Sequence, residues 1–89
     1  MPYDYQTEKQ ELFTERGQVM FLKIRDNVKY LLKQAGAVRM AEAINNCGGG
    51  NSWTMLACVD RLVELKEIVE ITAPGQVAGQ YRVFVKAYE

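Results

Sequence analysis

The chain has 89 residues, which is enough for one hydrophobic core and too few for two, so a single domain is expected. Hydrophobic residues make up 48% of it and charged residues 25%, as in ordinary water-soluble proteins. No apolar run approaches the roughly 20 residues that cross a membrane, so no membrane association is expected. The first residues, MPYDYQTEKQE, lack the basic and apolar parts of a targeting signal, and we therefore expect a cytoplasmic protein.

The residue types also argue against an enzyme. The chain has no histidine, which removes Ser-His-Asp catalysis, Cys-His catalysis and zinc sites that contain histidine. Cys47 and Cys58 form no CxxC pair, and two cysteines alone cannot complete a structural zinc site. We therefore expect no enzymatic activity, no metal and no cofactor, and two thiols that stay reduced.

The net charge is zero, but the charges are unevenly distributed along the chain. Residues 17 to 39 hold five basic side chains and one acidic one, whereas residues 40 to 70 hold two basic and five acidic ones. Arg25, Lys29 and Lys33 recur every four residues and form a basic stripe on one side of a helix. A solvated face explains the stripe most simply, and a ridge that contacts phosphates is the alternative.

Residues 1 to 16 are predicted to form an N-terminal arm that precedes a domain covering residues 17 to 89. The background of the arm is polar, and its few apolar anchors are Tyr3, Tyr5, Leu12 and Phe13. The arm either frays in solution or packs on a second copy of the chain, which would make the protein a homodimer.

The next pattern indicates a long helix from about Glu15 to Ala35. Its apolar side chains fall within one arc of roughly 120° at the helical repeat, so this helix should face the core. Gly36 follows as the residue that ends it. A second helix is expected to end before Gly48, because three successive glycines cannot continue it.

A third helix is predicted from Asn51 or Ser52 to about Leu65. The side chains expected on its buried face are Met55, Leu56, Val59, Leu62 and Val63. Those expected on its exposed face are Trp53, Thr54, Ala57, Asp60, Arg61 and Glu64. Together with the first two helices, this assignment predicts a core that includes Ile24, Val28, Leu31, Ile44, Leu56, Val59 and Leu62.

The C-terminal region predicts a β-hairpin. Residues 67 to 72 and 80 to 86 alternate between apolar and polar side chains, and the intervening Ala73 to Gly79 supplies turn residues. Either face of the second strand, QYRVFVK, could be the buried one. The turn has no Lys or Arg, so it lacks the charge with which a wing contacts a DNA backbone.

The run SWTMLACVDRLVELKEIVEI resembles the recognition helix and first wing strand of MarR-like and related winged-helix regulators. The resemblance covers about residues 17 to 86, and Leu62, Leu65, Ile68 and Val69 stand at its apolar positions. Glu67 stands where those families commonly have glycine. The resemblance implies an α+β fold, a winged helix-turn-helix in which three helices precede a C-terminal β-hairpin wing. It also implies that Ala37 to Arg39 forms the very short first strand common in winged helices.

Two functions remain open at this point. The first is a small DNA-binding transcriptional regulator, forming a dimer, whose third helix enters the major groove of double-stranded DNA. Its predicted nucleic-acid-binding residues are Asn51, Ser52, Thr54 and Arg61, and Arg39 and Lys29 are expected to contact the DNA backbone. The alternative is a protein–protein interaction module on the same scaffold. Its predicted partner-binding residues are Trp53, Asp60 and Glu64.

Overall fold

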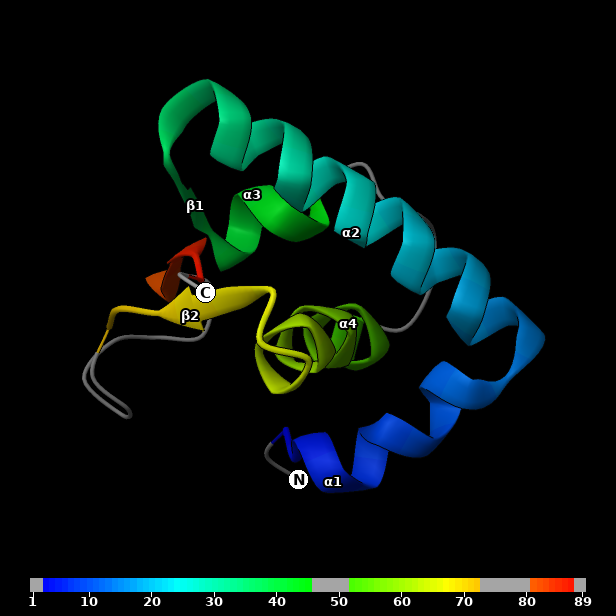
Figure 1. Ribbon diagram of the computed structural model, residues 1–89. Helices are drawn as coiled ribbons and strands as arrows, with labels where there is room; N and C mark the ends of the chain where they lie inside the picture. Colours follow the sequence, from blue (N-terminus) through cyan, green and yellow to red (C-terminus); the bar gives the residue numbers. More distant parts are fainter. Residues whose placement is uncertain (1–2, 46–51, 73–80, 88–89) are drawn as a thin grey trace.

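The computed structural model describes residues 3–45, 52–72 and 81–87 (Figure 1). Its elements in chain order are α1 (Tyr5–Glu8), the 3-10 helix η1 (Lys9–Phe13), α2 (Glu15–Ala35), β1 (Ala37–Arg39), α3 (Met40–Ile44), α4 (Ser52–Glu64), β2 (Ile68–Glu70) and β3 (Val83–Lys86). The predicted α+β class is confirmed. The glycine turn, Cys47, Asn51 and the predicted hairpin turn lie outside the described residues. None of the described helices combines the length and the apolar character needed to span a bilayer.

The long helix α2 begins and ends where the sequence predicts. At its start, the Thr14 hydroxyl oxygen accepts a hydrogen bond from the backbone N–H of Gly17 at 3.0 Å, so a free helical donor is capped. At its end, Gly36 takes a left-handed φ of 79°, and its N–H donates to the carbonyl oxygen of Leu32 at 2.8 Å. Both ends of α2 are therefore set by local chemistry.

The three strands form one antiparallel sheet in the order β1-β3-β2. Val38 of β1 and Glu70 of β2 both lie opposite Phe84 of β3. Phe84 is fully buried, so the face of β3 that carries Phe84 is the one turned to the core. This settles which face of the QYRVFVK run is buried, although the strands are shorter than the alternating pattern predicts.

The core confirms most of the predicted buried residues. Ile24, Val28, Val59 and Leu62 are at most 1% exposed, while Leu31, Ile44 and Leu56 are half-buried and pack against the core. The remaining fully buried large side chains are Leu12, Val38, Met40, Cys58 and Phe84. Leu12 belongs to the region predicted as a separate arm, so that region contributes to the core of the domain.

The predicted orientation of α4 is wrong by roughly one residue's rotation. Ala57, which the periodicity places on the exposed face, is fully buried, and Thr54 is only 8% exposed. Leu56 and Val63, predicted to lie on the buried face, are half-buried. Figure 1 shows the cause, because α4 lies between α2 on one side and the N-terminal helices on the other. Both sides of α4 are therefore covered by protein.

Truncating Leu62 to alanine should lower the free energy of unfolding by about 2 to 5 kcal/mol, because the change leaves a cavity in the core. Leu65, three residues later, is 44% exposed and serves as a matched control. Leu65→Ala should cost less than about 1 kcal/mol in the same urea titration. Equal losses for the two variants would mean that Leu62 is not buried in the core.

Candidate functional site

The N-terminal segment, residues 3–13, covers α4 through polar contacts. The Tyr3 hydroxyl donates to Asp60 Oδ2 at 2.6 Å, and the Tyr5 hydroxyl donates to Glu64 Oε1 at 2.8 Å. Lys9 Nζ lies 2.9 Å from Glu64 Oε2. Two carboxylates predicted to bind a partner are therefore occupied by contacts within the chain.

The remaining charges on this side of α4 are also paired. Arg82 Nη2 lies 2.8 Å from Asp60 Oδ1 and 2.8 Å from Glu70 Oε1, so Arg82 joins α4 to β2. Arg61 forms an ion pair with Glu64, and its guanidinium lies 5.6 Å from the centroid of the Phe13 ring. The acidic face of α4 is thus neutralised by the fold.

The structure also shows how exposed and how engaged the residues predicted to read DNA bases are. The expectation that Thr54 faces solvent is wrong, since it is only 8% exposed and lines a hollow together with residues at the start of α2. Arg61 retains 26% of its side-chain exposure but is engaged with Glu64. Ser52 is the first residue of α4, and Trp53 is half-buried rather than projecting freely. Among the described residues of α4, Thr54 and Arg61 are therefore not freely presented to a DNA groove.

Gly17 explains how the N-terminal segment approaches α2 so closely. A Cβ atom at this position would lie 1.9 Å from the carbonyl oxygen of Glu11 and 2.8 Å from the Cα atom of Leu12. Atoms of the backbone cannot move aside as a flexible side chain does, so the contact requires glycine. This role could not be predicted from the sequence, because a glycine inside an amphipathic helix gives no periodic signal.

The contacts of Glu64 alter its ionisation. Hydrogen bonds from Lys9, Tyr5 and Arg61 favour the carboxylate and lower the pKa of Glu64 from 4.5 to about 2. Burial, followed by the hydrogen bond to Glu64, raises the pKa of Tyr5 to about 12. The hydrogen bonds from Arg82 likewise lower the pKa of Glu70.

The pKa of Glu64 predicts how the protein responds to acid. Since its pKa is lower in the folded state, the ionised carboxylate stabilises the fold above about pH 4.5, and this stabilisation is lost as the pH falls toward about 2. Glu64→Gln should therefore be less stable than the parent protein at neutral pH, and the difference should shrink across that window. Unfolding titrations at a series of pH values measure it, and a difference independent of pH would argue against these contacts.

A second region, which we call the basic groove, lies where the C-terminal half of α2 meets the α4–β2 turn and the end of β3. Its volume is about 660 Å³. The floor is apolar and is formed by Val28, Leu32, Leu62 and Ile68. The cationic side chains that line it are Arg25, Lys29, Lys33, Lys66 and Lys86. Glu67 is the one acidic residue in the lining.

The cations of the basic groove are weakly paired. Lys29 Nζ lies 3.8 Å from Glu67 Oε1, and Arg25 Nη2 lies 3.7 Å from the exposed Asp26. Such long, exposed pairs contribute little to stability. Arg25 Nε is buried without a hydrogen-bond partner among the described residues, and Lys33 forms no ion pair with any of them. The groove therefore keeps most of its positive charge available.

The backbone of the α4–β2 turn places Lys66 on this groove. Lys66 adopts a left-handed φ of 63°, and its N–H donates to the carbonyl oxygen of Val63 at 3.0 Å. Glycine is normally favoured at a position with a left-handed backbone conformation. The position in this turn that favours glycine is thus Lys66. It lies one residue before Glu67, where the winged-helix families commonly have glycine.

The two residues predicted to contact the DNA backbone lie in different parts of the structure. Lys29 lies in the basic groove, together with the other two members of its stripe. Arg39 is exposed at the start of α3, where its N–H donates to Glu42 Oε1 at 3.3 Å, and it lies outside the groove lining. Lys66 and Lys86 were not predicted, because only the tertiary fold brings them beside α2.

The chain matches no protein-family model, and neither a curated protein nor a solved structure matches it. The chemistry of the basic groove and of the covered helix α4 is therefore the basis for a functional conclusion.

Proposed function

We propose that this chain is a small winged-helix protein that binds double-stranded DNA through the basic groove. The order of its elements and the β1-β3-β2 order of its sheet support the winged-helix assignment. In this proposal DNA is held by its phosphate backbone, and α4 does not enter the major groove. The predicted homodimer stays a prediction.

The observation that carries the proposal is the charge of the basic groove, where five cationic side chains accompany one carboxylate. Lys and Arg beside phosphates release condensed counterions, and this release supplies most of the affinity of sequence-independent DNA binding. Clustering matters here because the chain as a whole has no net charge. A polyanion is therefore attracted to this surface specifically.

The spacing of the cations also suits a polyanion. Arg25, Lys29 and Lys33 lie on successive turns of α2, so their backbones span about 12 Å along the helix. One DNA strand presents a phosphate about every 3.4 Å of helix axis, so the stripe reaches along about three phosphates. Lys66 and Lys86 extend the charge across the groove.

Backbone contacts position DNA without reading its sequence. Thr54 is buried and Arg61 is paired, so these two of the residues expected to read bases are not freely presented. The proposed binding is therefore independent of base sequence, and duplexes of unrelated sequence should bind with similar affinities.

A salt titration of duplex binding tests the proposal. If four to five phosphates are contacted, the logarithm of the binding constant should fall against the logarithm of the salt concentration with a slope of about −4. Two duplexes of unrelated sequence should give the same slope and similar affinity. Absence of binding at low salt, or a slope close to zero, would rule out the basic groove as a DNA site.

A further inference from the structure

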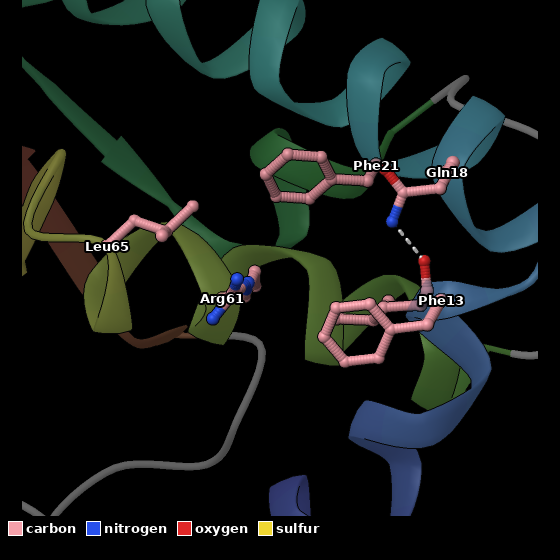
Figure 2. Close-up of a pocket in the computed structure, with 6 residues that line it drawn as sticks. Phe13, Gln18, Phe21, Arg61 and Leu65 are labelled. Atoms are coloured by element: carbon pink, nitrogen blue, oxygen red, sulfur yellow. Dashed lines mark hydrogen bonds between the residues drawn. The ribbon is translucent and has the colours of Figure 1, made fainter.

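A second hollow is lined mostly by apolar side chains (Figure 2). It has a volume of about 270 Å³ and is lined by Leu12, Phe13, Gln18, Phe21, Arg61 and Leu65. Phe13 is 61% exposed and Leu65 is 44% exposed, although both are large apolar side chains. The side-chain amide of Gln18 donates to the carbonyl oxygen of Leu12 and ties η1 to α2 at one side of the hollow.

The apolar hollow and the basic groove lie end to end along the seam between α2 and α4. On α2, Phe21 in the hollow is one turn before Arg25 in the groove. On the other wall, Leu65 in the hollow is followed directly by Lys66 in the groove. The seam therefore has an apolar end and a cationic end.

DNA does not account for the apolar end, because a duplex backbone offers phosphates and sugars rather than a group that fills an apolar hollow. We infer that the seam also docks an acidic segment of a partner protein that carries an aromatic or aliphatic anchor. The anchor would occupy the apolar hollow, and the acidic side chains would lie along the cationic end. Because both ligands would use the same lysines, the segment would compete with DNA.

Charge complementarity fixes the chemistry of each part of this segment. In the hollow, the charge of Arg61 is matched by its ion pair with Glu64, so the anchor should be uncharged. The Arg61 guanidinium lies over the Phe13 ring and holds one wall of the hollow in place before any partner binds. At the other end, the weakly paired Lys29 and the available Lys33 favour carboxylates.

The dimensions of the seam set the length of the segment. The backbone of α2 from Gln18 to Lys33 rises about 22 Å, at about 1.5 Å per residue. An extended peptide covers that distance with about seven residues. The acidic side chains should therefore begin within about four residues of the anchor and continue for one or two turns of α2.

A displayed library of random peptides of about twelve residues, selected against the full chain, tests this inference because such peptides are long enough to span the seam. Enriched peptides should combine a net negative charge with an aromatic or aliphatic pair, and a labelled example should be displaced by duplex DNA. Enrichment without acidic bias, or a selected peptide that binds together with DNA, would overturn the inference.

Two variants locate the site on the seam. Phe13→Ser should weaken binding of the selected peptide at least tenfold, as removing an interface anchor does, and should leave the affinity for duplex DNA unchanged. Val19→Ser is a matched control, because Val19 is 51% exposed on α2 and lines neither the hollow nor the groove. If Phe13→Ser leaves the affinity of the selected peptide unchanged, the apolar hollow is not used.

The same measurements separate this inference from the proposed function. Peptide binding without DNA binding would contradict the proposed function and support the docking site, since the docking site does not depend on DNA. DNA binding with no enriched acidic peptide would do the reverse. Circular dichroism of each variant shows that a loss of binding does not come from unfolding.

Discussion

Gly17→Ala is expected to destabilise the protein by about 3 kcal/mol or more, and to release the N-terminal segment from α4. Alanine normally stabilises the interior of a helix by about 1 kcal/mol relative to glycine, so the expected effect has the opposite sign to the helical propensity. The reason is the carbonyl oxygen of Glu11, which would lie 1.9 Å from the new Cβ atom. Relief requires η1 to move, and η1 carries the buried Leu12.

Urea unfolding measures this effect, and Lys23→Ala is the matched control. Lys23 is exposed on the same helix and lines neither the hollow nor the groove, so its replacement by alanine should change the unfolding free energy by less than about 0.5 kcal/mol. A Gly17→Ala protein as stable as its parent would show that η1 does not pack on α2 as described.

The double variant Lys29→Glu/Lys33→Glu is expected to weaken duplex binding at low salt by at least about tenfold, and by more if the new carboxylates repel phosphates. Loss of two phosphate contacts should also reduce the magnitude of the salt slope by about 1.8. Both positions are exposed on α2, so the fold should be retained.

Arg16→Glu/Lys23→Glu provides the control for net charge. It makes the same total change in charge on the same helix, at exposed positions that lie outside the basic groove. Its affinity for the duplex should stay close to that of the parent protein. Equal losses in the two double variants would mean that overall charge, and not the basic groove, governs binding.

Features set by local chemistry could be predicted from the sequence. The ends of α2 follow from Gly36 and from its amphipathic pattern. The stripe of Arg25, Lys29 and Lys33 likewise follows from spacing alone and lies on one groove in the structure. The strand at Ala37 to Arg39, in contrast, is expected only from the winged-helix resemblance.

The rotation of α4 could not be predicted, because apolar residues surround this helix. Ala57, Cys58 and Leu56 are consecutive in the apolar pattern, so several orientations satisfy it almost equally well. What selects one is the N-terminal segment, whose Tyr3 and Tyr5 bond to α4 from 57 and 59 residues away. A periodic pattern holds no information about such distant contacts.

The same limit applied to the candidate site. Asp60 and Glu64 have the pattern of solvent-facing acids, and only the fold shows that Arg82, Lys9 and Tyr5 neutralise them. Because the acids of α4 are paired within the fold, the basic groove, whose cations are only weakly paired, is the charged surface on which the proposed function rests. The proposed contact surface is therefore the basic groove between α2 and the α4–β2 turn, in place of the predicted exposed face of α4.

The most direct test of this account is a backbone amide NMR titration of the full chain with a duplex at low salt. The account predicts shift changes concentrated in the second half of α2, from Arg25 to Gly36, and around Lys66 and Lys86. The amides of Tyr3 to Phe13 and the centre of α4 should change little. Shift changes concentrated on Trp53 to Arg61, together with release of the N-terminal segment, would show that α4 itself meets the DNA and would contradict the account.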